Sequence, residues 1–100
     1  MRLDASDPQW VRVSGLKELV AANASQLRDQ VRMAITPACQ GVDVDLSETT
    51  LLDSSGMGAL IAIHKTLRGQ GATLRIVRPT PGVLQILELT RLHRLFEIVS

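Results

Sequence analysis

The spacing of apolar and polar positions changes several times along the chain, and each change predicts a new element. Apolar and polar side chains alternate over 10–13 and again over 42–46, as is typical of strands with one buried face. Between these segments, apolar residues recur every three or four positions and predict an amphipathic helix that Pro37 ends. The apolar positions of this helix are Val20, Ala24, Leu27, Val31 and Ile35.

The second half of the chain continues with the same two periods. Its predicted elements are an apolar pair at 51–52, a strongly apolar helix over 57–67, a strand over 72–78, a helix that starts at Thr80 and Pro81, and a short turn with a closing strand over 92–99. Residues 1–9 lack such a pattern, so we expect an irregular N-terminal segment. Strands that alternate with helices build right-handed crossovers. The chain, 1–100, is therefore predicted to be one α/β domain with helices packed against a mixed, mostly parallel sheet of about four or five strands.

Two further details of the pattern concern helix starts. Asn23 followed by Gln26 suits a capping box, although the apolar spacing begins one turn earlier. Thr80 before Pro81 suits an N-cap followed by the first helical position.

Composition indicates what kind of core this domain has and where in the cell it is expected. Hydrophobic residues make up 45% of the chain with one Trp and one Phe, so the core must be aliphatic. The single cysteine, Cys39, cannot form an internal disulfide, and we expect it at a loop or at the edge of the core. Met33 and Met57 suit either gap-filling in the core or an adaptable contact surface, and the core is favoured. The chain shows no leader pattern and no apolar run long enough to span a membrane, so a cytoplasmic location is expected.

The net charge argues neither for nor against a nucleic-acid surface, but the distribution of the cations argues against one. The net charge is +1, and the two halves differ, with −3 over 1–53 and +4 over 54–100. The cations of the second half are dispersed and have no aromatic residues between them on which bases could stack. We expect neither a nucleic-acid nor a membrane partner, and a monomer or a weak dimer.

The stretch LLDSSGMGAL, residues 51–60, lies where a strand ends and a helix begins, a place at which functional groups gather in such sheets. A catalytic serine is not favoured there. Neither Ser54 nor Ser55 has glycines two residues away on both sides, as a nucleophile elbow needs. His64 follows Ser55 by about 13 Å of helix, and His93 lies among charged residues near the C-terminus.

Phosphate-binding loops and metal sites are not favoured either. Gly56 and Gly58 lack the third glycine of a dinucleotide-binding loop, and no Walker sequence is present. One cysteine and two distant histidines make no metal-ligand set. Asp43 and Asp45 are two residues apart on one side of a strand and are best interpreted as a solvated face. We therefore expect no cofactor and no metal.

The two adjacent serines remain as the candidate chemistry. One hydroxyl can cap the helix while the other points outward. A phosphate on the outward serine would add about −1.5 to −2 charges. The helix dipole would tolerate this charge and Asp53 would repel it. Such a change suits a binding switch on a folded domain, with a simple helix cap as the alternative.

The segments Val42–Ser47 and Leu52–Gly58 resemble the signature of the STAS domain family, and more narrowly that of the bacterial anti-sigma factor antagonists. The resemblance continues through 69–71, 74–77 and 89–98, and covers 10–99. It implies a non-catalytic domain with a mostly parallel sheet.

The resemblance also implies partners. The unmodified form would bind an anti-sigma factor that is a serine kinase of the histidine-kinase-like ATPase fold, and so regulate transcription. This kinase would phosphorylate Ser55 and release the domain, and a metal-dependent serine phosphatase would restore binding. Asp53 would shape the turn or engage the kinase, and Ser54 would cap the helix. Gly56 and Met57 complete the partner-binding motif, and Gly58 is expected to pack closely at the helix start.

The sequence departs from the family pattern at two places. Only one early strand is visible where the family has two. The turn after this strand differs from the family's acidic turn, and Glu18 is the residue that would stand in for the family's acid. Arg91 stands where the family often has glycine. The second function that the resemblance allows is a constitutive STAS regulatory subunit, such as the partner of a transporter ATPase, in which Ser55 is only a helix cap.

Overall fold

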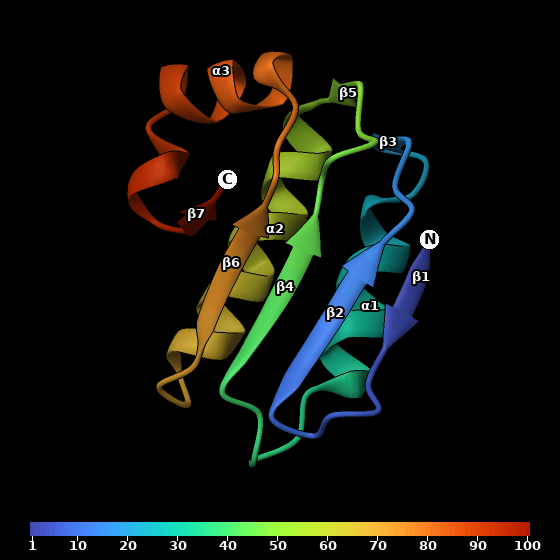
Figure 1. Ribbon diagram of the computed structural model, residues 1–100, viewed down its shortest axis with the longest axis vertical. Coiled ribbons are helices and arrows are strands. Elements are labelled where there is room, and N and C mark those ends of the chain that lie inside the picture. The colour runs from blue at the N-terminus through green and yellow to red at the C-terminus, as the bar shows by residue number, and fades with distance from the viewer.

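The computed structural model describes residues 1–100 and contains a five-stranded sheet with helices on one face (Figure 1). The strands are β1 (Arg2–Asp4), β2 (Trp10–Ser14), β4 (Gly41–Asp45), β6 (Thr73–Val77) and β7 (Glu97–Val99), and they lie side by side in this order. β1 is antiparallel to β2, and every other pair is parallel. The prediction of an α/β domain with a mixed, mostly parallel sheet is confirmed.

The helices are α1 (Ala24–Ala34), α2 (Ser54–Arg68), α3 (Pro81–Leu89) and the 3-10 turn η1 (Leu92–Arg94). Two short strands, β3 (Glu18–Leu19) and β5 (Leu51–Leu52), form a separate parallel pair. In Figure 1, α1 and α2 lie behind the sheet, and α3 lies across its upper end. The predicted turn and closing strand over 92–99 are confirmed as η1 and β7.

The expectation of an irregular segment over 1–9 is wrong for its first part, because residues 2–4 form β1. Leu3 pairs with Val13 in register and points toward the core side, while Arg2 and Asp4 point outward. A strand with a single inward apolar residue carries too little periodicity to be visible in the sequence. It forms because β2 supplies its hydrogen-bond partners.

The core lies between the helices and the inner face of the sheet. Leu27 and Val31 of α1 and Leu60 and Leu67 of α2 are fully buried, and all but one of the twenty core residues are non-aromatic. Cys39 is buried at the edge of this core, as expected.

The favoured expectation for Met33, a place in the core, is wrong. Its side chain is 86% exposed, because it lies outside the stripe that α1 buries, whereas Met57 is half-buried against the core.

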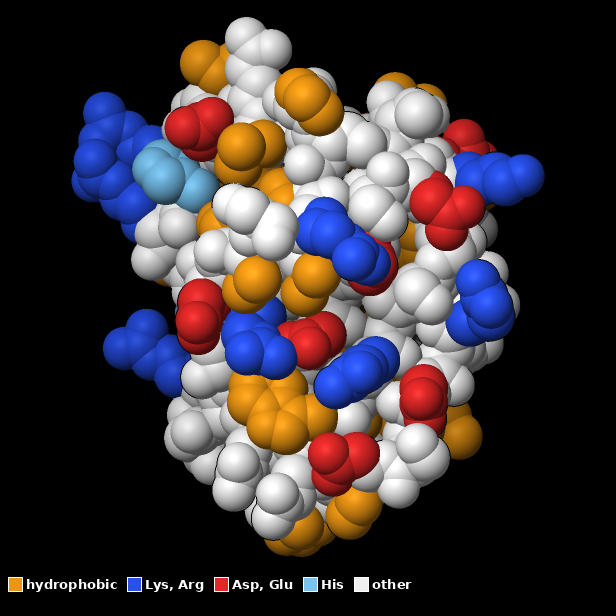
Figure 2. Space-filling model, viewed as in Figure 1, with side chains coloured by type: hydrophobic (Ala, Val, Ile, Leu, Met, Phe, Trp, Pro, Cys, Tyr) orange, Lys and Arg blue, Asp and Glu red, His pale blue; other side chains and the backbone are white.

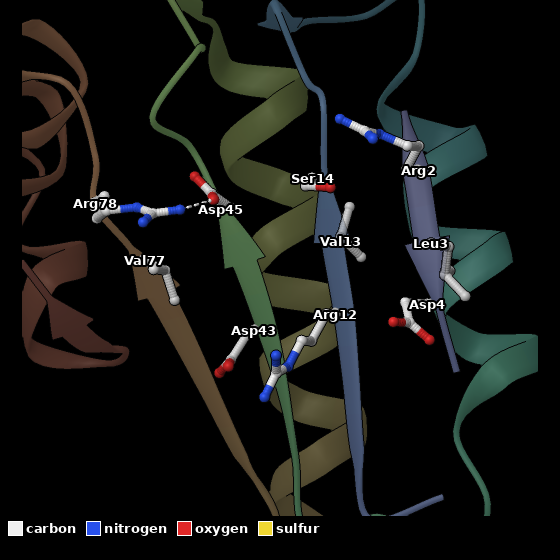
Figure 3. Close-up of a pocket in the computed structure, with 10 residues that line it drawn as sticks. All are labelled: Arg2, Leu3, Asp4, Arg12, Val13, Ser14, Asp43, Asp45, Val77 and Arg78. Atoms are coloured by element: carbon white, nitrogen blue, oxygen red, sulfur yellow. Dashed lines mark hydrogen bonds and ion pairs between the residues drawn. The ribbon is translucent and has the colours of Figure 1, made fainter. Parts of the chain in front are cut away.

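The opposite face of the sheet has no helix over it and is charged (Figure 2). Asp43 and Asp45 point outward here, as predicted, but each is paired with an arginine. The Arg75 guanidinium donates to both Asp43 oxygens at 2.7 and 2.9 Å and stacks 4.1 Å from the centre of the Trp10 ring. Arg78 binds Asp45 across the shallow hollow drawn in Figure 3. Ion pairs between neighbouring strands thus stabilise a face that remains in water.

α3 begins as predicted, with Thr80 at the N-cap and Pro81 at the first helical position. The Thr80 hydroxyl makes no capping bond. It donates instead to the Thr49 carbonyl at 2.7 Å, which attaches the start of α3 to the loop before β5.

Candidate functional site

The first turn of α2 is organised by Asp53, which is the N-cap residue. One carboxylate oxygen accepts a hydrogen bond from the Gly56 amide at 2.8 Å, and the other accepts from the Ala21 amide at 3.0 Å. The expectation that Ser54 caps the helix is wrong. Ser54 is already the first helical residue, whereas the extended backbone of Asp53 places its carboxylate over the free amides of the turn. The expectation that Asp53 shapes the turn is confirmed.

The turn is held against a segment more than thirty residues earlier in the chain. β3 runs parallel to β5, and the Leu19 carbonyl accepts from the Asp53 amide at 3.3 Å. This pairing places Glu18 directly beside Leu51. The structure therefore brings Glu18 next to the strand that leads into the two serines.

Asn23 stabilises the turn after β3 and forms no capping box with Gln26. Its side-chain oxygen accepts from the Val20 amide at 2.9 Å, and its side-chain amide donates to the Glu18 carbonyl at 2.7 Å. The side chain is thus used on the loop that precedes α1. This loop presents the Ala21 amide to Asp53.

The two glycines of the turn have different surroundings. A Cβ atom on Gly56 would lie 2.2 Å from the Leu19 carbonyl oxygen, so only glycine allows α2 to approach β3 this closely. A Cβ atom on Gly58 would meet nothing within 4 Å. The expected close packing at Gly58 is therefore wrong, and Gly56 is the residue that provides it.

The hydroxyl groups of Ser54 and Ser55 are free. Both residues are exposed, and neither side chain takes part in a hydrogen bond within the protein. Leu51 next to them is 54% exposed, and Glu18 is also exposed. Together these four residues form an outward surface, which we call the serine surface. Met57 is half-buried at its base, and Gly56 is buried beneath it.

The electrostatics of the turn favour an ionised Asp53. Its hydrogen bond from the Gly56 amide, supported by the Ala21 amide, holds the pKa of the carboxyl below its usual value of 3.8. Neither histidine serves the serines. The His64 ring packs edge-on against Phe96 with 5.7 Å between centroids, and His93 Nδ1 lies 3.4 Å from the Leu87 carbonyl oxygen.

Sequence reasoning missed two members of this site. Ala21 takes part through its backbone amide. Every residue except proline has such an amide, so the residue type gives no signal of this contact. Leu51 belongs to an apolar pair whose exposed member could not be told from its buried one. Alternation over only two residues is too short for that distinction.

The geometry matches a known domain family. The family model described as "Mlab, STAS domain" matches residues 2–99. The chain belongs to this family. The resemblance seen in the sequence is therefore confirmed, and the match includes β1, which the sequence pattern did not reveal.

Relatives of this STAS domain are found among both sequences and structures. A STAS-domain containing protein of Pseudomonas aeruginosa (strain UCBPP-PA14) is 36% identical over 67 residues, which are 67% of this chain and 64% of that protein. The match thus spans less than two thirds of the relative. A candidate anti-sigma factor antagonist from Thermotoga maritima superposes with a TM-score of 0.88 at 25% identity, over 99% of this chain and 85% of that one.

The Bacillus protein SpoIIAA, an anti-sigma factor antagonist, superposes in its unphosphorylated form with a TM-score of 0.81. The identity is 20%, over 99% of this chain and 87% of that one, and this likeness supports the fold of the STAS domain. None of the helices combines the length and apolar character that crossing a membrane requires.

Proposed function

We propose that this STAS domain is an anti-sigma factor antagonist that works as a phosphorylation-controlled protein-interaction switch. The unphosphorylated form binds an anti-sigma factor that is also a serine kinase of the histidine-kinase-like ATPase fold. Phosphorylation of Ser55 releases this partner, and a serine phosphatase restores binding. One observation carries the proposal. Asp53 caps α2, so the exposed Ser55 hydroxyl is not needed to hold the helix start and can be modified without loss of the fold.

A phosphate on Ser55 would change the charge of the serine surface strongly. It adds about −1.5 to −2 charges at neutral pH, next to an Asp53 carboxyl whose pKa is already lowered. Glu18 lies on the neighbouring strand and adds a further negative charge. The start of α2 partly offsets the repulsion through its dipole. A partner that packs against the neutral serines would meet a strongly anionic surface after phosphorylation.

Leu51 supplies the apolar contact that such a partner needs. It is 54% exposed beside Glu18, while its neighbour Leu52 is buried. An exposed leucine flanked by hydroxyl groups and a carboxylate has the character of an interface, in which an apolar centre is surrounded by a polar rim. We assign Leu51, Ser54, Ser55 and Glu18 to direct partner contact. Gly56 and Met57 act from below by fixing the helix start.

The test uses the intact chain with ATP and candidate serine kinases encoded near it. Mass spectrometry of the peptide that spans 51–65 is expected to find one phosphate, on Ser55. The Ser54→Ala variant is the matched control and should be phosphorylated like the wild type. Phosphate on Ser54 of the wild type, or equal kinase binding by the phosphorylated and unmodified forms, would contradict the proposal.

The exposed Leu51 also favours a second candidate, a constitutive regulatory subunit such as the partner of a transporter ATPase. In that case the apolar contact carries the affinity and Ser55 is not modified. Ser55→Ala and Ser55→Asp would then bind the partner equally well, whereas Leu51→Ser would weaken binding about tenfold or more. The switch requires instead that Ser55→Asp binds weakly while Ser55→Ala binds constitutively.

A further inference from the structure

β1 is the terminal strand of the five-stranded sheet, and no segment lies beside its outer edge (Figure 1). In an antiparallel pair, every second residue directs its backbone N–H and C=O groups away from the partner strand. Because β2 is the only strand beside β1, these outward groups have no strand to bond within the chain. Protected edges are often short, as β1 is, but they also carry lysine, proline or a bulge. β1 has none of these and pairs regularly with β2 through all three of its residues.

The charges of β1 are self-complementary. Arg2 and Asp4 flank Leu3, and both point to the helix-free face of the sheet, where they line the hollow drawn in Figure 3. Neither side chain takes part in an ion pair within the chain. A second copy of β1 that pairs antiparallel with the first, centred on Leu3, places Arg2 of each copy opposite Asp4 of the other. Side chains that lie directly opposite have Cβ atoms about 4.5–5.5 Å apart, so both pairs attract each other.

The helix side of the same edge is apolar and uncharged. Leu3 points to this side and lines a shallow hollow with Gln30, Met33 and Ala34 of α1. Met33 is the most exposed large apolar side chain of the protein, at 86%. Methionine adapts its shape to irregular contacts, so this position suits an interface that is empty in the single chain.

The arginines of α1 are kept away from this hollow. Arg28 and Arg32 line a different hollow, between α1 and α2, and Arg28 is paired with Asp29. A second copy that approaches the β1 edge therefore meets the Met33 hollow on the helix side and the Arg2 and Asp4 charges on the other.

We propose that a second copy of this chain pairs with the β1 edge, so that the two sheets join antiparallel about a twofold axis at Leu3. A twofold axis brings the same surface of both copies together, and this surface has to complement itself. β1 meets that condition, because its two charges have opposite signs and lie symmetrically about Leu3. The Met33 hollows of the two copies then face each other across the axis.

A contact of this kind makes a weak dimer. Three residues of each strand and one shallow hollow offer a small area, whereas specific stable interfaces bury about 1,200–2,000 Å² in total. The dimer is therefore expected to dissociate on dilution. It requires neither a kinase nor a phosphate on Ser55, so its test stands apart from that of the proposed function.

The test is sedimentation velocity of the unphosphorylated full chain over a series from about 10 μM to 1 mM, in which a monomer should give way to a dimer. Arg2→Asp and Asp4→Arg each turn both attractive pairs into repulsive ones. Each variant alone should dimerise about tenfold more weakly than the wild type. Met33→Ser should weaken the dimer by about threefold, through the lost apolar contact.

An equal mixture of Arg2→Asp and Asp4→Arg gives the decisive result. The first chain carries carboxylates at both positions and the second carries guanidinium groups at both, so a mixed antiparallel pair is attractive at both places. The mixture should therefore dimerise where each variant alone stays monomeric. The matched control is Arg94→Asp, which makes the same change of charge in η1 near the opposite edge of the sheet and should dimerise as the wild type does.

Thermal melting at low concentration separates dissociation from unfolding. Arg2 lies opposite Ser14 in the β1–β2 register, so Arg2→Asp should melt as the wild type does. Asp4 lies opposite Arg12, so Asp4→Arg should melt somewhat lower through like-charge repulsion within its own sheet. A wild type that stays monomeric throughout the series would overturn the proposal. Variants that dimerise like the wild type, or a mixture that stays monomeric, would also overturn it.

Discussion

The first turn of α2 has an inner and an outer side that differ completely in their contacts. On the inner side, the Asp53 carboxylate accepts two backbone hydrogen bonds and Gly56 lies against the Leu19 carbonyl. On the outer side, the serine hydroxyls have no partner and Gly58 borders open space. Neighbouring residues of one motif therefore carry separate tasks. The inner residues hold the turn, and the outer ones are free to be recognised or modified.

The strongest way to break this contrast is to place a side chain on the inner side. Gly56→Ala introduces a Cβ atom where 2.2 Å separates it from the Leu19 carbonyl oxygen, so α2 must move away from β3. We expect the free energy of unfolding to fall by about 3 kcal/mol, as in other overpacked cores. Urea unfolding measures this loss. An unchanged unfolding midpoint would show that the turn can relax without cost.

Replacing Asp53, the N-cap residue, tests how much its charged carboxylate on the inner side contributes to stability. Asp53→Ala loses both hydrogen bonds at the helix start, and the melting temperature should drop by roughly 5 °C at neutral pH. Because the folded pKa of Asp53 lies below 3.8, its contribution is complete above pH 3.8 and is lost as the pH falls through the lower folded value.

The melting temperatures of wild type and Asp53→Ala should therefore converge in acid. Asp53→Asn keeps the size of the side chain but places an amide group on one side. It should retain only part of the cap. A gap between wild type and Asp53→Ala that persists below the folded pKa would assign the stability to packing instead of charge.

The outer side should tolerate what the inner side rejects. Gly58→Ala adds the same atom as Gly56→Ala, but it meets nothing and removes a flexible residue from a helix interior. We expect a gain of about 0.5–1 kcal/mol in the free energy of unfolding. Urea unfolding of the two variants side by side gives the comparison directly, and a loss of stability in Gly58→Ala would contradict the open surroundings of this position.

The smallest effect on stability is expected at the serines. Ser54→Ala and Ser55→Ala each remove a hydroxyl group that has no hydrogen-bond partner. The free energy of unfolding should therefore change by less than about 0.5 kcal/mol. Ser55→Asp should likewise stay folded and, under the proposed switch, weaken binding to the proposed kinase partner, as measured by calorimetry. A large drop in its melting temperature would mean that a negative charge at this position acts on the fold as well as on the surface.

Most strands and helices were predictable because each presents one repeating face to the core. The alternation in β2 and β4 and the spacing in α1 persist over enough residues to set the element type. β1 was missed because its three residues contain one inward apolar side chain. Met33 was expected in the core because methionine is apolar. Its position on α1 lies outside the buried stripe of that helix, and the position decides its exposure.

The location of the candidate site in the chain was predictable, but the roles of its individual residues were less so. The polar break DSSG marks the strand-to-helix turn in the sequence alone. Three residues on that turn compete for one capping position, and the sequence cannot decide among them. The choice of Asp53 depends on its extended backbone and on the Ala21 amide, which arrives from a loop thirty-two residues earlier.

The sequence by itself determined the order of the longer strands and helices, the aliphatic core and the position of the serine-containing turn, since these follow from local periodicity and residue type. Only the tertiary structure decided that Asp53 caps α2, that Gly56 and not Gly58 is sterically required, and that Glu18 lies beside Leu51. It also decided that Arg91 adopts a left-handed backbone between α3 and η1. The Ala21 amide on Asp53, the Leu19 carbonyl against Gly56 and the pairing of Glu18 with Leu51 all join segments far apart in the chain, so they are specified only once the chain has folded.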